Sequence, residues 1–235
     1  NADNYKDYNN IDKAIEHLKF QSEAIKFTRE ILPNSKSLIG FVGGPWTLVR
    51  YAFGKDHFTN DHKNLYFEFL STTLVPLLKK NIKMQLGAGA EIVMIFDSSL
   101  YDLENEVFKE NYITILEDIS SSFPNKVGYY SRGKQEADIL PCMNYPFAGF
   151  GFDSSINLKN IFKSSKNGFV QGNFDEKSML LSGDEFKQKL KIYINSIKSI
   201  ENRDGWVCGL GHGINKQTSE KNVHLFLENI RKEFS

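Results

Sequence analysis

Cysteine is scarce in this sequence. Its 235 residues include two cysteines, Cys142 and Cys208, and no closely spaced pair of them. Disulfide frameworks and the usual zinc sites need more cysteines, or cysteines at short spacing. The sequence therefore predicts a cytoplasmic protein with neither a disulfide framework nor a metal site.

Long apolar runs and an excess of one charge are also lacking. No run reaches the ~20 apolar residues that cross a bilayer. Lys plus Arg and Asp plus Glu both number 29, which gives a formal net charge of zero. A neutral balance argues against a general binder of polyanions, and no basic cluster interleaved with aromatic residues is present. We expect neither a membrane nor a nucleic acid as partner.

Signals for processing and for common nucleotide or hydrolase sites are missing too. The N-terminal NADNYKDYNN has no apolar signal-peptide core and no starting Met, so we expect the natural chain to begin earlier. The GxGxxG, P-loop, HExxH, GxSxG and EF-hand patterns do not occur. No cofactor is predicted.

The chain does contain six short apolar runs. Continuous runs of this kind are typical of parallel strands covered on both faces. They lie at Ser37–Gly43, Glu91–Asp97, Lys126–Ser131, Phe147–Asp153, Gly168–Asn173 and Trp206–Gly211.

Longer segments with helical periodicity lie among these runs. They are residues 11–32, 65–86 with a kink expected at Pro76, 106–119, 185–200 and 220–234. The alternation predicts a single α/β domain over residues 1–235, with a parallel sheet that is either a barrel or doubly wound. Six strands are two short of a closed eight-stranded barrel.

Polar residues and glycines follow the predicted strands, where parallel folds carry their chemistry. Repeated glycine beside Asp, Asn, Ser and His suggests a cleft that offers backbone N–H groups to an acidic ligand. Asp97 and Asp153 are equally compatible with helix N-caps.

Four further positions leave alternatives open. The Gly43-Gly44-Pro45 run could be a plain turn into a helix. Arg132 could bind an anion or pair with a neighbouring carboxylate, and Tyr51 could lie over the cleft or in the core. His212, between two glycines, favours a functional role.

Four segments together resemble uroporphyrinogen decarboxylase. Residues 38–48 with Tyr51 are similar to the family's "IGF-G-PWTL--Y", and Phe96-Asp97-Ser98 to its "F-[DE]-S". Residues 171–175 are similar to "QGNLD", and residues 210–223 to "LGHGI---TP-ENV". These matches occur in the family's order across nearly the whole chain.

The resemblance implies a TIM (β/α)8-type barrel, with about six of its eight βα units in this chain, and a homodimer. It implies a cofactor-free carboxy-lyase that converts the four acetate arms of uroporphyrinogen III to methyls, giving coproporphyrinogen III in haem synthesis. Tyr51, Ser98 and His212 fall on substrate-contacting positions, Phe96 falls near the pocket, and Gly43 and Gly44 belong to the same rim. The family's catalytic Arg and Asp residues come from the first two strands, outside this chain, so we expect the chain alone to be inactive.

Several positions depart from the family pattern. Ser99-Leu100-Tyr101, Ser154, Glu176 and Asn215-Lys216 replace residues that are commonly glycine, aromatic or proline there. A divergent or non-catalytic paralogue that binds an acidic ligand is therefore one alternative. A corrinoid-dependent methyltransferase of the same superfamily is another, and it would need a His and Cys zinc site.

Overall fold

The computed structural model describes residues 10–54, 62–164 and 168–234. Their contacts divide the chain into two compact units, each described below by itself. Unit 1 is residues 1–134 with 144–148, and unit 2 is residues 135–143 with 149–235. The single-domain expectation stays a prediction.

Unit 1 contains three parallel strands with helices between them. Strands β1 (Ile39–Gly43), β2 (Ile92–Asp97) and β3 (Val127–Ser131) pair in chain order, and Phe96 lies opposite both Gly43 and Tyr130. The helical elements are α1 (Ile11–Glu16), α2 (Lys19–Ile31), α3 (Pro45–Phe53), α4 (Lys63–Phe69), η4 (Leu70–Leu74), α5 (Val75–Gly87), η5 (Leu100–Asp102), α6 (Asn105–Val107), η6 (Phe108–Tyr112) and α7 (Ile113–Ser122).

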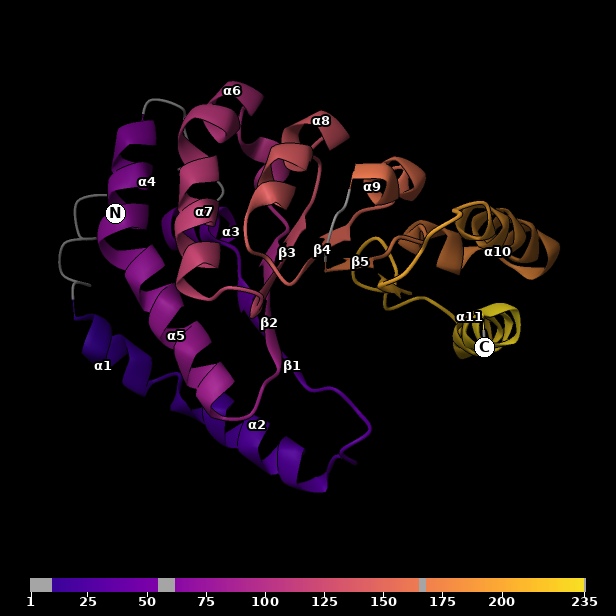
Figure 1. Cartoon of the computed structure of the whole chain (residues 1–235), viewed down its shortest axis with the longest axis horizontal. Helices are drawn as coiled ribbons and strands as arrows, with labels where there is room; N and C mark the ends of the chain where they lie inside the picture. Colours follow the sequence, from indigo (N-terminus) through magenta and orange to yellow (C-terminus); the bar gives the residue numbers. More distant parts are fainter. Residues whose placement is uncertain (1–9, 55–61, 165–167, 235) are drawn as a thin grey trace. The chain divides into compact units, whose positions relative to one another are not determined.

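The core of unit 1 lies between these strands and their covering helices. Val93 and Ile95 of β2 are fully buried, as are Ile82 of α5 and Leu116 of α7. Figure 1 shows α5 and α7 along one side of the strands. Helices α5 and α7 therefore cover the face of β2 that carries Val93 and Ile95.

The predicted helices of unit 1 are more broken than expected. Residues 11–32 form two helices, with a break at His17 and Leu18 that no Pro or Gly signals. The expected irregularity near Pro76 takes the form of the π-helical turn η4, which ends just before α5. Pro has no N–H to donate to an earlier carbonyl, which accounts for a lost helical bond there. A second π-turn, η6, interrupts the segment predicted at 106–119.

Unit 2 also contains three parallel strands. Strand β5 (Phe169–Gln171) pairs with both β4 (Gly149–Phe152) and β6 (Trp206–Val207). The remaining elements are α8 (Glu136–Ile139), α9 (Leu158–Ser164), η8 (Glu176–Leu180), α10 (Gly183–Lys198) and α11 (Glu220–Phe234), with η7 (Leu140–Asn144) at the boundary of the two units. Helices α10 and α11 lie side by side (Figure 1).

Strand β6 is shorter than the predicted run 206–211. Its pairing nevertheless resumes at Leu210, which bridges Phe174 in parallel. The Phe174 N–H donates to Gly209 O at 3.0 Å, and the Gly211 N–H donates to Phe174 O at 2.7 Å. The predicted path is therefore correct, while the regular strand stops at Val207.

All six strands were placed correctly, and the expected α/β class with parallel strands is confirmed. Within the described ranges, no helix is both long and apolar enough to cross a bilayer.

Candidate active site

A buried carboxylate organises the carboxyl ends of the strands in unit 1. Asp97, the last residue of β2, is fully buried. Its Oδ1 accepts from the Thr47 N–H and from the Thr47 hydroxyl, both at 2.9 Å. Its Oδ2 accepts from the hydroxyls of Tyr112, in a short hydrogen bond, and of Tyr129 at 3.2 Å. We call these four residues the Asp97 network.

The Asp97 network caps the N-terminus of α3 from outside the helix. Gly44 is the N-cap of α3 and makes no side-chain cap. Asp97 accepts the Thr47 N–H instead, and the Tyr112 hydroxyl accepts the Trp46 N–H at 3.0 Å. The first turn of a helix leaves N–H groups without a partner inside the helix, and Asp97 and Tyr112 accept two of them. The N-cap reading of Asp97 is thus correct in kind, but the capped helix follows β1 and not β2.

Glycine at position 44 makes this arrangement possible. A Cβ there would lie 2.4 Å from Cγ of Asp97. The Gly44 N–H donates to Phe96 O at 2.7 Å. The "GPWT" segment therefore binds and packs against the Asp97 side chain.

Burial raises the pKa of Asp97, because a carboxylate without water around it is costly to charge. Hydrogen bonds from Tyr112, Thr47 and Tyr129 oppose that rise without cancelling it. Asp97 is thus a buried acid held in the packing between β2 and α3.

The other residues predicted for the rim of unit 1 lie at exposed or half-buried positions. Tyr51 is 73% exposed on α3, which settles its open alternative against the core. Phe96 is 36% exposed on the face of β2 opposite to Asp97, and Ser98 is half-buried just after the strand. Gly43 ends β1, where a Cβ would lie 2.8 Å from the Leu48 side chain. Their contacts with a substrate stay predictions.

In unit 2, Asn173 ties together the ends of two strands. Its side-chain amide donates to Asp153 O and to Ile156 O, both at 2.7 Å. The preceding Gly172 has φ of +132°, and its carbonyl accepts from the Tyr193 hydroxyl at 2.5 Å and the Trp206 ring N–H at 3.0 Å. The "QGN" segment therefore fixes the turn after β4 against the end of β5.

His212 lies just beyond the resumed pairing of the last strand and is half-buried. Gly211 explains its position, because a Cβ there would lie 2.5 Å from the Ser154 backbone N. Gly213 has open space where a Cβ would be. Of the two flanking glycines, only Gly211 is therefore required by packing.

Asp153 does not cap α9, which begins at Leu158. Its Oδ1 accepts from the Ser155 N–H at 2.8 Å and from the Ser155 hydroxyl. It stabilises the turn after β4, so the N-cap interpretation was wrong for this residue.

The predicted cleft of backbone N–H donors stays a prediction, but three of its glycines do not supply free donors. The N–H groups of Gly44, Gly172 and Gly211 donate to the carbonyls of Phe96, Val207 and Phe174. These glycines allow close approach of the backbone, and any contribution of Gly44 to ligand binding must come from its lack of a side chain.

Sequence reasoning missed several residues that shape these strand ends. Thr47, Tyr112 and Tyr129 hold Asp97, and the Asn222 side chain donates to Met179 O at 2.9 Å and Leu181 O at 2.7 Å. Thr47 and Asn222 lie within segments that resemble the family, which was the available signal. Tyr112 and Tyr129 carried none.

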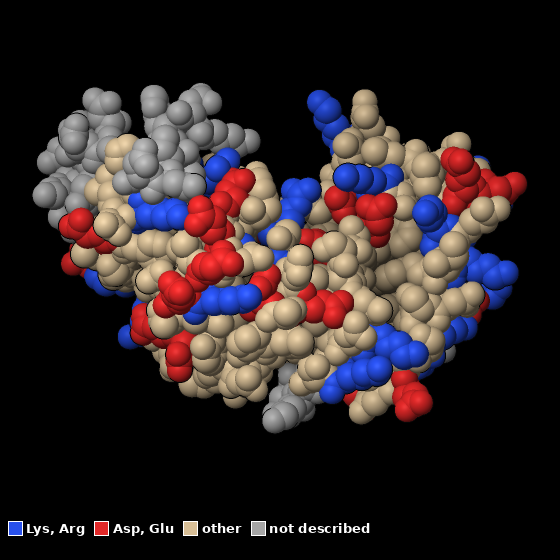
Figure 2. Space-filling view, turned by 90° about the horizontal axis from the view of Figure 1, so that it is seen from above, with Lys and Arg blue, Asp and Glu red and all other residues tan. Residues whose placement is uncertain are grey.

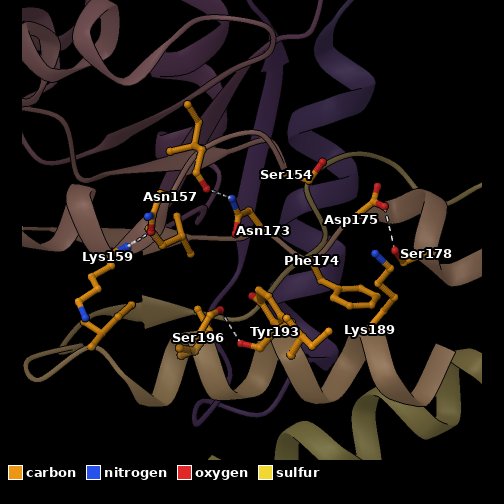
Figure 3. A pocket seen from close by; sticks show the side chains of 15 residues that line it. Ser154, Asn157, Lys159, Asn173, Phe174, Asp175, Ser178, Lys189, Tyr193 and Ser196 are labelled. Atoms are coloured by element: carbon orange, nitrogen blue, oxygen red, sulfur yellow. Dashed lines mark hydrogen bonds between the residues drawn. The ribbon is translucent and has the colours of Figure 1, made fainter. Parts of the chain in front are cut away.

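A pocket of about 280 Å³ lies within unit 2 between the strand ends and α10. Figure 3 shows Asn157, Asn173 and Asp175 around it, with Phe174 and Tyr193 toward α10. His212 is not among its lining residues. This pocket is therefore separate from the predicted substrate contact at His212.

Both cysteines are free thiols, with Cys142 buried and Cys208 half-buried. Burial raises the pKa of the Cys142 and Cys208 thiols to about 12 in each case. Across the described ranges, no group of three or more His, Cys, Asp or Glu residues is placed to hold a metal ion.

Basic and acidic side chains are interspersed over the face shown in Figure 2.

Comparison with known proteins gives consistent matches. The family model of uroporphyrinogen decarboxylase matches residues 1–233. Similar curated proteins include the uroporphyrinogen decarboxylases of Orientia tsutsugamushi strain Ikeda, 31% identical over 91% of this chain and 65% of that protein, and of Campylobacter lari, 30% identical over 95% of this chain and 68% of that protein. The chain thus spans about two thirds of the length of these relatives.

Among solved structures, a B12-independent methionine synthase from Shewanella sp. W3-18-1, in complex with selenomethionine, has a TM-score of 0.60. The two sequences are 14% identical, and the match covers 90% of this chain and 67% of the methionine synthase chain. At this identity the likeness shows the fold alone, and it supports the predicted TIM-barrel class. On the extent of its family match, the chain belongs to the uroporphyrinogen decarboxylase family.

Proposed function

We propose that the complete protein decarboxylates the four acetate side chains of uroporphyrinogen III to give coproporphyrinogen III. The observation that carries this proposal is the family match over residues 1–233. Curated relatives at about 30% identity bear the name of that enzyme. A homodimer and a cytoplasmic location belong to the same proposal.

The reaction sets requirements that the strand ends can partly meet. Loss of CO2 leaves electron density on a carbon attached to a pyrrole, and a proton must then reach that carbon. The pyrrole N–H groups need an acceptor, and the peripheral carboxylates need cationic or N–H donors. The resemblance assigns most of the catalysis, including the acceptor for the pyrrole N–H groups, to Arg and Asp residues on strands outside this chain. We therefore propose that the chain described here contributes binding and that it is inactive by itself.

The proposed polar contacts of this chain with the substrate are Tyr51, Ser98 and His212. All three are exposed or half-buried. No hydrogen bond joins Ser98 or His212 to another residue in the described part of the chain, so their donors can serve a ligand. Phe96 supplies an apolar surface beside Ser98, with Gly43 and Gly44 at the adjoining strand end.

Conversion of uroporphyrinogen to coproporphyrinogen by the complete, folded protein tests the proposal. Turnover supports it, and a folded protein without turnover favours the non-catalytic paralogue. The methyl-transfer alternative predicts stoichiometric zinc in the purified protein.

A further inference from the structure

An aromatic strip crosses one face of the strands in unit 1. Phe41, Phe96 and Tyr130 lie on neighbouring strands, with ring centroids 6.3 Å apart for Phe41 and Phe96 and 5.8 Å for Phe96 and Tyr130. Phe41 is 68% exposed and Phe96 is 36% exposed. Tyr130 is only 7% exposed, so the accessible part of this aromatic strip is Phe41 and Phe96.

Two polar residues follow the strands that carry the strip. Asp97 and Ser131 are buried on the opposite face and pair in register, as Phe96 and Tyr130 do. Successive residues of a strand point to opposite faces. Ser98 and Arg132 each directly follow the last paired residue of β2 and β3, so both lie at the carboxyl end of the strands that carry Phe96 and Tyr130.

The backbone on both sides of Arg132 is fixed. Ser131 pairs with Asp97, and Gly133 turns the chain with φ of +77°, where a Cβ would lie 2.5 Å from Cβ of Tyr101. The Lys134 side chain is only 4% exposed and donates to the Leu103 carbonyl and to Asn105 Oδ1. These constraints hold Arg132 at the end of β3 with little freedom of its backbone.

The guanidinium of Arg132 has no ion-pair or hydrogen-bond partner among the described residues. It is half-buried and forms no ion pair or hydrogen bond with them. Nearby cations differ in this respect, since Arg50 pairs with Asp102 and Lys134 binds Leu103 and Asn105. Arg132 is therefore a positioned cation with unused donors, two residues after Tyr130 at the carboxyl end of β3.

We propose that Arg132 binds a peripheral carboxylate of the tetrapyrrole while Phe41 and Phe96 of the aromatic strip contact the macrocycle. The inference rests on the proposed function and assigns a specificity role within it. Arg presents a planar fork that pairs with a carboxylate through two hydrogen bonds, and partial burial strengthens such a pair. The alternative of an internal ion pair at Arg132 finds no partner among the described residues.

Binding of uroporphyrin III, the oxidised and unreactive form, tests the proposal by fluorescence titration of the complete protein. Arg132→Gln should weaken binding by about ten-fold or more, as expected for loss of a hydrogen bond between charged groups. Arg132→Lys should fall between this variant and wild type. Arg231→Gln, at an exposed position of α11, removes the same charge away from the strand ends and should bind as wild type does. Circular dichroism confirms that each variant is folded, and Arg132→Lys decides the matter if Arg132→Gln does not fold.

The outcomes separate this proposal from the proposed function. Equal affinity of wild type and folded Arg132 variants would overturn the role of Arg132, even if the enzyme turns over. Weakened binding in Arg132→Gln without turnover by wild type would keep the role and overturn the decarboxylase function. Failure of wild type to bind uroporphyrin would overturn the role of Arg132 and would leave the proposed function to the turnover assay.

Discussion

Thr47 donates two hydrogen bonds to one oxygen of Asp97, from its backbone N–H and from its hydroxyl, each 2.9 Å long. The two residues lie on different elements, α3 and β2, and both are buried. The same hydroxyl accepts the Ser99 N–H at 3.0 Å. This pair therefore couples the start of α3 to the turn that carries Ser98.

Thr47→Val tests this coupling. The change keeps the side-chain volume but leaves Asp97 and the Ser99 N–H each short of a partner, so we expect a loss of about 1–3 kcal/mol in the free energy of unfolding. Urea denaturation measures it. Thr114→Val, at an exposed position of α7, is the matched control and should change stability by no more than about 0.5 kcal/mol. Equal effects of the two changes would show that the Asp97 network is not a stabilising unit.

The pH dependence of stability tests the raised pKa of Asp97. Between the ordinary carboxyl value of 3.8 and the raised native pKa, the native state binds more protons than the unfolded state. The contribution of Asp97 to the free energy of unfolding is therefore greatest below this window and falls as pH rises through it. Asp97→Asn cannot titrate, so the stability of wild type relative to Asp97→Asn should decline with rising pH. A relative stability that grows with pH would mean that hydrogen bonds outweigh burial and lower the pKa.

Gly211→Ala tests the close contact that places His212. The new methyl would lie 2.5 Å from the Ser154 backbone N, so the turn after β4 or the last strand must move. We expect a loss of about 1–3 kcal/mol in the free energy of unfolding, as for overpacking elsewhere. Gly213→Ala is the control, since open space surrounds its position and its φ is not positive. Similar stability of the two variants would contradict the packing role of Gly211.

The path of the chain was largely predictable from the sequence. Apolar runs located all six strands because burial on both faces leaves a local signature. The break at His17 and Leu18 and the π-turn at Phe108–Tyr112 were not predictable, because no local residue type marks them.

The strand-end networks were only partly predictable. Asp97 was correctly identified as a candidate helix cap, yet its partners Thr47, Tyr129 and Tyr112 lie 50, 32 and 15 residues away in sequence. Such contacts arise from the tertiary fold, and no pattern within one segment encodes them. Likewise, Gly211 was noted beside His212, but its packing partner Ser154 belongs to another strand end.

His212→Ala in the complete protein tests the predicted substrate contact. His212 is half-buried and forms no hydrogen bond within the described ranges, so its loss should leave the fold intact. We expect kcat/KM for uroporphyrinogen to fall by about ten-fold, the effect of losing one charge-assisted contact. Thermal unfolding should match that of wild type, and an unchanged kcat/KM would remove His212 from the site.

Decarboxylation of uroporphyrinogen III by the complete protein, followed by separation of the products, tests the central claim most directly. We predict stepwise loss of the acetate carboxylates, with coproporphyrinogen III as the final product and no requirement for an added cofactor. A folded protein that leaves uroporphyrinogen III unchanged would contradict the proposed function.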